Sequence, residues 1–165
     1  MLWTVAWAIS IALVLLFSLV ILVGAPFLPT LKNHVEPALD MLNLKPGQTL
    51  LELGSGDGRI LIAAAKRGIN SFGYELNPLL VVYSWLITRK YRKHVHIIWG
   101  NYWVKPWPRA DGVFVFLLQP YMQKLDKKII QYKHKPVKLV SFAFDIKSRK
   151  AAANKQGMYL YVYTK

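Results

Sequence analysis

Residues 51–60 read LELGSGDGRI, and this stretch decides the fold. An apolar run enters a cluster of three glycines, Gly54, Gly56 and Gly58, and a helix-like apolar pattern follows. A strand that ends in a glycine turn and continues into a helix is how nucleotide-binding sites begin in open α/β sheets. The dinucleotide fingerprint G-x-G-x-x-G is not met, because Arg59 stands at the position of the third glycine. The stretch therefore predicts a nucleotide-type ligand other than a dinucleotide.

Two acidic residues near the turn narrow the choice of ligand. Glu52 lies two residues before Gly54, where it would repel a pyrophosphate but could hold an ammonium group. Glu75 lies 21 residues after Gly54, at the end of the next expected strand, where a carboxylate can accept hydrogen bonds from ribose hydroxyls. S-Adenosyl-L-methionine carries both a ribose and an amino-acid ammonium group. The two acids therefore favour S-adenosyl-L-methionine as the cofactor.

Strand-like and helix-like patterns alternate along the rest of the chain. We expect strands at residues 49–53, 71–75, 94–99, 112–118, 138–144 and 157–164, and helices at residues 35–44, 58–67, 78–90 and 121–131. Asn77 is expected to cap the third of these helices, with Pro78 at its first position. The alternation predicts an open, mostly parallel α/β sheet with helices on both faces and an antiparallel edge strand at the tail.

These motifs resemble those of the class I (Rossmann-like) S-adenosylmethionine-dependent methyltransferases, and the resemblance covers residues 35–165. Glu52-Leu53-Gly54-Ser55-Gly56-Asp57-Gly58 is similar to their first motif, and Tyr74-Glu75-Leu76-Asn77-Pro78 to their second. The resemblance implies cofactor contacts from Glu52, Gly54, Ser55, Gly56, Asp57, Gly58, Glu75, Leu76, Asn101 and Tyr102. Trp103 is an alternative to Tyr102 for packing on the adenine ring, and ordinary core packing is an equal alternative for both. Asn101 stands where the family usually has an acid that contacts the adenine amino group, and its carbonyl oxygen can still accept. The short tail suggests that one of the usual seven strands is missing or compressed.

A narrower resemblance rests on GYELNP, NYW and FVFLLQPYMQKLDKKI together with the glycine stretch. These segments resemble the membrane-anchored protein-lysine methyltransferases of the adenine nucleotide translocase and ATP synthase c-subunit type. The resemblance implies an enzyme that methylates a lysine side chain of a membrane-associated protein. It also suggests that Thr30 folds over the cofactor, although a simple linker at this position is an equal alternative.

The residues after the fourth expected strand bear on the identity of the methyl acceptor. Enzymes that methylate exocyclic amines of bases carry Asp/Asn-Pro-Pro-Tyr/Phe after the fourth strand, but this chain has Leu118-Gln119-Pro120-Tyr121, which makes nucleic acid an unfavoured partner. A lysine, whose pKa in water is ~10.4, must lose its proton before it attacks, and desolvation in an aromatic pocket lowers that pKa. We therefore expect Tyr121, Gln119 and Phe144 to form the acceptor pocket, with plain core packing as the alternative.

Two further functions stay open at this point. The acceptor could instead be a lipid or another small amphiphile, or the domain could be a non-catalytic binding module. The four histidines show no metal-ligand spacing, so no metal site is expected.

The excess of apolar residues is concentrated at the N-terminus. Residues 2–23 carry no charge, and a helix of 22 residues is about 33 Å long, which exceeds a ~30 Å hydrocarbon core. A secretory signal peptide would need a positive first segment, which is lacking. We therefore expect a transmembrane helix at 2–24, a connector and short helix at 25–48, and the methyltransferase domain at 49–165. A re-entrant or core-buried helix is the alternative for the first segment.

The charge distribution predicts the surroundings of the domain. The formal net charge is +14, and all 22 Lys and Arg residues follow residue 31. Such a balance favours an anionic partner, and with an anchor this is the lipid headgroup layer. The positive-inside rule places the catalytic domain on the cytoplasmic side. The lack of an Arg-rich presequence points to a prokaryotic inner membrane.

Overall fold

A computed structural model describes residues 1–23 and 30–164, with side chains of the first helix described for residues 1–12 and 14. The strands are β1 (Thr49–Leu53), β2 (Asn70–Glu75), β3 (Val95–Trp99), β4 (Gly112–Val115), β5 (Val137–Phe142), β6 (Ala153–Lys155) and β7 (Met158–Tyr163). The helices are α1 (Leu2–Val23), α2 (Lys32–Leu42), α3 (Arg59–Lys66), α4 (Pro78–Ile87), the 3₁₀ turn η1 (Arg89–Tyr91) and α5 (Gln119–Ile130).

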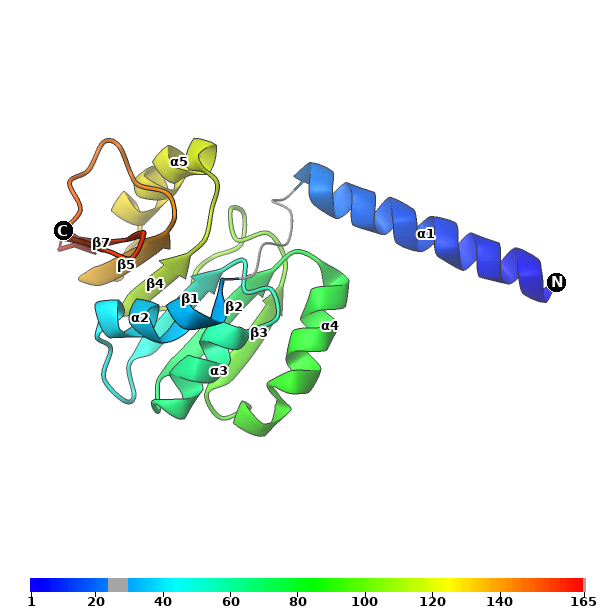
Figure 1. The fold of residues 1–165 in the computed structure, drawn as a ribbon, viewed down its shortest axis with the longest axis horizontal. Helices are drawn as coiled ribbons and strands as arrows, with labels where there is room; N and C mark the ends of the chain where they lie inside the picture. Colours follow the sequence, from blue (N-terminus) through cyan, green and yellow to red (C-terminus); the bar gives the residue numbers. More distant parts are fainter. Residues whose placement is uncertain (24–29, 165) are drawn as a thin grey trace.

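In the described part of the chain the strands form a seven-stranded sheet in the order β3-β2-β1-β4-β5-β7-β6. The first five of these are parallel, and β7 runs antiparallel to both β5 and β6 (Figure 1). The mostly parallel α/β sheet with helices is therefore confirmed. The expected loss of one strand is wrong, because the tail forms a tight hairpin of β6 and β7. The three-residue β6, not the tail strand, is the edge.

The two faces of the sheet are covered by different helices. The crossovers from β1 to β2 and from β2 to β3 step in one direction, so α3 and α4 lie on one face together with α2. The crossover from β4 to β5 steps the other way and puts α5 on the opposite face. On β1, Leu50 packs with α2 and α3, whereas Leu51 and Leu53 pack with α5. All four residues of β4 are buried, as its unbroken apolar run predicts.

Several element boundaries differ from the prediction by one to three residues. Helix α2 begins at Lys32, three residues before the expected start. Helix α4 ends at Ile87, because Thr88 leads into η1. Strand β4 ends at Val115, and Leu118 already serves as the N-cap residue of α5. Residues 116–118 therefore form a loop beyond the carboxyl end of β4.

The N-terminal segment forms the expected helix from Leu2 to Val23. Of the helices in the described residues, however, none is both long and apolar enough to cross a membrane. The predicted single-pass anchor is therefore not found in this part of the chain. Residue 24 and the first part of the predicted connector lie outside the described residues.

Candidate functional site

The sheet order places a topological switch point between β1 and β4. After β3 the chain returns across the sheet to form β4 on the other side of β1. Ligands of open α/β sheets bind at such a point, beyond the carboxyl ends of the strands. The glycine turn follows β1 directly and the residues of the predicted acceptor pocket follow β4 and β5, so the topology brings the two groups to one edge.

The glycine turn needs glycine for its backbone conformation. Gly54, Gly56 and Gly58 have φ angles of +85°, +54° and +76°, which side chains disfavour. The N–H groups of Gly54 and Ser55 both donate to the carbonyl oxygen of Tyr74, at 2.9 and 2.8 Å. These two hydrogen bonds hold the turn over the end of β2. The three positive φ angles explain why glycine recurs at every second position of the turn.

Gly73 of β2 belongs to the site, although it was not among the residues expected there. A Cβ atom at this position would lie 2.5 Å from Leu61 Cδ1 and 2.6 Å from Ser55 Cβ. Only a residue without a side chain lets the turn and α3 pack this closely on β2. A glycine inside a strand is a general signal of such a close approach.

The Glu75 carboxylate is fixed by two backbone groups. Its Oε2 atom accepts from the N–H of Gly56 and its Oε1 atom from the N–H of Asn77, both at 2.8 Å. Asn77 in turn caps α4 by accepting from the N–H of Leu79 at 2.9 Å, as predicted. Each carboxylate oxygen has a second lone pair. The buried carboxylate is therefore oriented and can accept two more donors, such as a pair of hydroxyls.

Glu52 is the most unusual charged group of the site. It is 5% exposed, and within the described residues its Oε2 atom has no hydrogen-bond partner. Burial raises the pKa of the Glu52 carboxyl well above its ordinary value, and the nearby charges of Asp57 and Glu75 raise it further. The buried Ser55 hydroxyl also has no partner among the described residues. An ammonium group would supply both the missing donors and the missing positive charge.

Arg59 links the turn to the segment before α2. Its guanidinium pairs with Asp57 at 2.5 Å and donates to the carbonyl oxygen of Thr30 at 2.7 Å. Thr30 is buried, and its contact with Arg59 places it next to the glycine turn. In the sequence Arg59 stands out only because it replaces a glycine. The structure gives it a role of its own, since it bridges two expected cofactor residues.

Hydrogen bonds to the backbone hold two side chains near the end of β3. Asn101 lies at the end of β3, but its Oδ1 atom accepts from the N–H of Trp103 at 2.8 Å, so one lone pair of this oxygen is already used. Its predicted contact with an adenine amino group would depend on the other lone pair. The carbonyl oxygen of Leu76 accepts from the indole of Trp99 at 3.1 Å. This contact fixes the backbone next to Glu75.

Tyr102 lies between the expected cofactor residue Glu75 and the expected acceptor residue Tyr121. Burial raises the pKa of its hydroxyl, and the charges of Tyr121 and Glu75 contribute to the same shift. Its ring lies 4.9 Å from the ring of Trp103, which lies 6.3 Å from that of Tyr121. A chain of aromatic rings therefore connects the end of β3 with the first turn of α5.

The expected acceptor residues share the rim formed after β4 and β5. The Gln119 amide nitrogen donates to the carbonyl oxygen of Asp145 at 3.0 Å. The carbonyl oxygen of the neighbouring Phe144 accepts from the Ser141 hydroxyl at 2.7 Å. Tyr121 is 39% exposed in the first turn of α5. Gln119 and Phe144 are therefore held in place, whereas Tyr121 is open to solvent.

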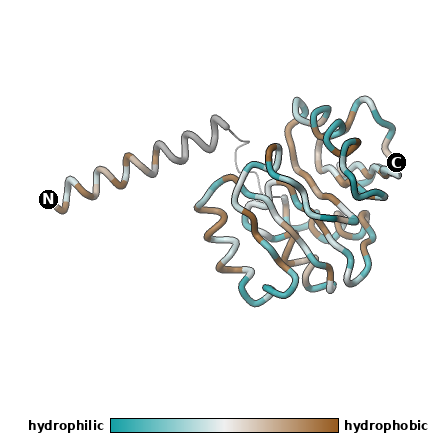
Figure 2. Tube along the Cα trace, turned by 180° about the vertical axis from the view of Figure 1, so that it is seen from behind, coloured by the Kyte–Doolittle hydropathy of each residue, from teal (hydrophilic) through white to brown (hydrophobic). Residues whose placement is uncertain are grey.

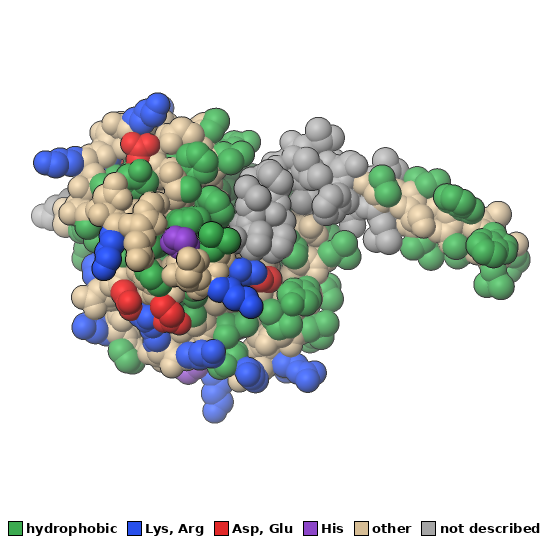
Figure 3. Space-filling model, in the orientation of Figure 1, with side chains coloured by type: hydrophobic (Ala, Val, Ile, Leu, Met, Phe, Trp, Pro, Cys, Tyr) green, Lys and Arg blue, Asp and Glu red, His purple; other side chains and the backbone are tan. Residues whose placement is uncertain are grey.

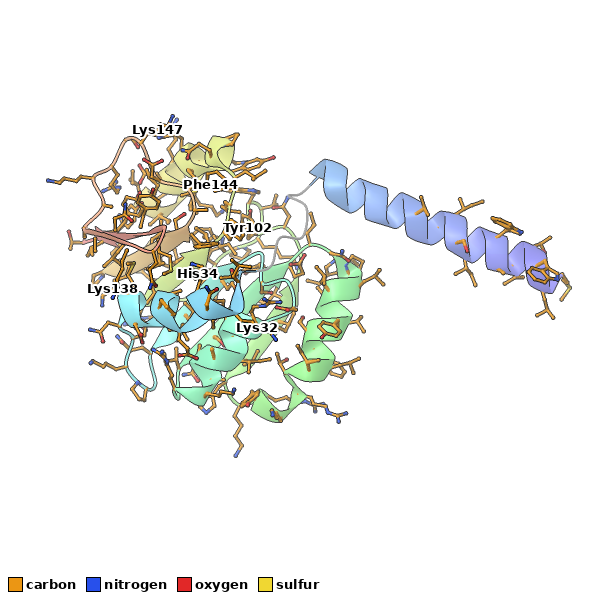
Figure 4. All side chains as sticks on the ribbon, viewed as in Figure 1. Lys32, His34, Tyr102, Lys138, Phe144 and Lys147 are labelled. Atoms are coloured by element: carbon orange, nitrogen blue, oxygen red, sulfur yellow. The ribbon has the colours of Figure 1, made fainter. Side chains whose placement is uncertain are left out.

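His34 of α2 is a further candidate residue of the functional site, and no sequence motif indicates it. Its ring lies 4.8 Å from the ring of Phe142, which lies 4.8 Å from that of Phe116. Its Nδ1 atom is buried and has no hydrogen-bond partner in the described part of the chain. His34, Tyr102 and Phe144 come from α2, the segment after β3 and the segment after β5 (Figure 4). Only their tertiary arrangement reveals His34, because the four histidines show no motif spacing.

Comparison with known sequences gives a family match. The profile described as "ANTKMT methyltransferase domain" matches residues 52–153. The human lysine N-methyltransferase of the ATP synthase c-subunit is 39% identical over 108 residues, which is 63% of this chain and 45% of that protein. The mouse "Adenine nucleotide translocase lysine N-methyltransferase" is 33% identical over 107 residues, or 63% of this chain and 46% of that protein. The chain spans about half the length of the curated relatives it matches.

Comparison with solved structures supports the fold. An RNA methyltransferase from Salinibacter ruber, crystallised in complex with S-adenosyl-L-homocysteine, superimposes with a TM-score of 0.78. The match covers 84% of this chain and 95% of that protein at 26% sequence identity. A methyltransferase from Thiobacillus denitrificans with the same ligand matches at a TM-score of 0.57 over 69% of this chain and 49% of that one, with 18% identity.

Proposed function

The chain belongs to the ANTKMT methyltransferase domain family, and we propose that it uses S-adenosylmethionine to methylate a lysine side chain of a membrane-associated protein. The observation that carries the cofactor assignment is the buried, partly unpaired Glu52 beside the fixed carboxylate of Glu75. The lysine assignment is supported by the two curated relatives, whose names describe lysine N-methyltransferases.

The donor set fits the proposed cofactor. When bound, S-adenosylmethionine supplies a methyl group on a positively charged sulfur. Glu52 would hold the ammonium group, and Glu75 would accept from the ribose hydroxyls. Tyr102, beside Glu75 and half-buried, is suited to pack on the adenine ring. Asp57 and Arg59 would keep the segment at Thr30 closed against the turn.

The residues on the acceptor side have to bind the substrate lysine with its amine in the neutral form. Aromatic rings that close around a bound lysine would exclude water and thereby lower the pKa of its amine. The Gln119 amide nitrogen is committed to Asp145, so its carbonyl oxygen is the group that can accept an N–H of the substrate. His34 is a candidate for the group that accepts the lysine proton, because its buried Nδ1 needs a partner. Transfer itself requires alignment more than acid–base power.

The membrane part of the proposal rests on hydrophobicity and charge. The described side chains of α1 are mostly apolar and exposed, and the formal net charge is +14. A membrane-associated substrate would then lie within reach of a domain held at the same surface on its cytoplasmic side. Lipid or a small amphiphile is the alternative acceptor in this setting.

A second candidate substrate is RNA. The match to the Salinibacter ruber RNA methyltransferase covers most of both chains, and the basic charge of this protein suits a polyanion. Against it stands Leu118-Gln119-Pro120-Tyr121, which lacks the acidic or amide residue and the second proline of base-amine methyltransferases.

The proposal is tested by following a labelled methyl group. The full chain is incubated with membranes and methyl-labelled S-adenosylmethionine, and the protein, lipid and RNA fractions are then separated. Label in a protein band, with mass spectrometry showing methylated lysine, is the expected result. Label confined to the lipid extract or to RNA would assign the enzyme to one of the other substrates.

Two variants provide the controls. Glu75→Ala should abolish labelling, because it removes the carboxylate that Gly56 and Asn77 orient. Asp40→Ala makes the same change of charge at an exposed ion pair with Arg67 and should leave labelling unchanged. Calorimetry with S-adenosylhomocysteine separates a non-catalytic module from an enzyme with an unidentified substrate. If the wild type does not bind this ligand, the cofactor assignment is wrong.

A further inference from the structure

Helix α4 exposes an apolar face to solvent. Leu79, Val82, Tyr83 and Leu86 recur with the spacing of one helix face, and their exposed fractions lie between 49% and 57%. Trp85 and Ile87 widen this face. Within α4, all of which the structure describes, Ser84 alone is buried. Figure 2 shows α4 largely in the hydrophobic colour, and in Figure 3 hydrophobic side chains gather over it.

This arrangement is the reverse of an ordinary surface helix. Such a helix turns its apolar side to the core and a polar side to water. Here the side of α4 that faces the core is narrow, since it consists of Ser84. This residue lies against the glycine turn: a Cβ atom added to Gly58 would lie 3.5 Å from the Ser84 Cβ atom. Trp99, 61% exposed at the end of the edge strand β3, lies near the start of α4, because its indole donates to the carbonyl oxygen of Leu76. Contiguous apolar patches of this kind mark interaction sites.

Cations border the α4 face at its C-terminal end. Arg89, Lys90, Arg92 and Lys93 follow α4 directly and are all exposed. The Arg92 guanidinium lies 5.3 Å from the centre of the Trp85 ring, so the basic cluster adjoins the apolar face. No Asp or Glu occurs from residue 76 to residue 110. Figure 3 shows Lys and Arg side chains along the lower edge of the body, beneath the hydrophobic patch.

A plain structural reason explains only part of this pattern. Cations near a helix C-terminus stabilise the helix dipole, and one or two of them suffice for this. The absence of acidic residues over 35 positions and the exposed aromatic and aliphatic side chains need a second reason. An apolar face beside a row of cations is the composition of helices that lie in the interface of an anionic bilayer.

We propose that the α4 face docks on the surface of an anionic lipid bilayer. Leu79, Val82, Tyr83 and Leu86 enter the boundary between headgroups and acyl chains, while the cations after α4 contact the headgroups. Helix α4 also lies on the side of the body from which α1 extends (Figure 1). The α4 N-cap Asn77 adjoins Glu75, so docking would hold the cofactor edge of the domain close to the lipid. The proposal does not depend on the identity of the methyl acceptor.

The lack of cysteine makes a site-specific test possible. A nitroxide label is attached to the full-length Leu86→Cys variant, and to a Lys133→Cys variant whose site is exposed after α5 as the matched control. Each is mixed with vesicles of phosphatidylcholine, with or without phosphatidylglycerol. With phosphatidylglycerol, the label at 86 should gain collisions with lipid-soluble oxygen and lose collisions with a water-soluble nickel chelate. The label at 133 should change neither value.

Three results would overturn the proposal. First, the label at 86 could stay in water although the chain sediments with the vesicles. It could instead become shielded without vesicles as protein concentration rises, which would assign the α4 face to a second copy of the chain. Third, the change at 86 could persist when Arg89→Gln and Arg92→Gln are added to Leu86→Cys, although the proposal expects these two substitutions to abolish it without altering the circular dichroism spectrum. An undiminished change would show that headgroup charge is not what the surface recognises.

Discussion

Replacing Glu52 with glutamine should stabilise the cofactor-free chain and weaken cofactor binding at the same time. The carboxyl is buried, one oxygen has no partner among the described residues, and burial raises its pKa well above the ordinary 4.5. Glutamine keeps the shape but removes the charge. The folded chain therefore no longer holds a buried, poorly paired carboxylate, but it also loses the partner for an ammonium group.

The stability effect depends on pH with a definite sign. Because the folded-state pKa is raised, folding binds a proton more tightly, and the wild type loses stability as pH rises from 4.5 to the raised value. At pH 8 Glu52→Gln should therefore have a higher melting temperature than the wild type. Below pH 4.5 the difference should become small.

The affinity effect follows from the loss of a charged hydrogen bond. Such a bond contributes about 1.5–3 kcal/mol, so the Kd for S-adenosylhomocysteine should rise roughly 10- to 150-fold. Methylthioadenosine shares the adenosine but lacks the amino acid, and its Kd should not change. Calorimetry with both ligands and thermal unfolding between pH 4 and pH 8 measure the two effects independently.

Two outcomes would refute this reasoning. A lower melting temperature of Glu52→Gln at pH 8 would mean that the charged carboxylate is well satisfied in the folded chain. An equal loss of affinity for both ligands would mean that Glu52 shapes the turn and does not hold the ammonium group. Glu75→Gln is the matched comparison, because it should weaken the binding of both ligands by removing an acceptor for ribose hydroxyls.

Two further predictions concern residues that the tertiary structure brought to the site. Gly73→Ala places a methyl group 2.5 Å from Leu61 Cδ1 and should lower the free energy of unfolding by about 1–3 kcal/mol in urea titrations; an unchanged midpoint would show that α3 moves freely. His34→Phe retains an aromatic ring against Phe142 and should lower turnover by about 100-fold without changing the Kd for S-adenosylhomocysteine. An unchanged turnover would limit His34 to packing.

Much of the fold could be predicted because local patterns dictate it. The strand at 49–53 has the predicted bounds, since an apolar run meets a glycine turn that ends it. Asn77 and Pro78 begin α4 as predicted, because a side-chain cap and a fixed φ act within a few residues. The glycine spacing, together with Glu52 and Glu75, likewise predicts the cofactor from residues close to one another in the sequence. The sequence does not predict β6, because a strand of three residues carries too little pattern to be recognised alone.

The amino-acid sequence alone determined the order of strands and helices and the chemistry of the glycine turn, because hydrophobic periodicity and glycine conformation act over short distances. Only the tertiary structure decided which distant groups meet. It brought Arg59 to the Thr30 carbonyl and His34 to Phe142, and it left the apolar side of α4 uncovered. An apolar pattern shows that a face avoids water. Whether another element covers that face depends on how the whole chain packs.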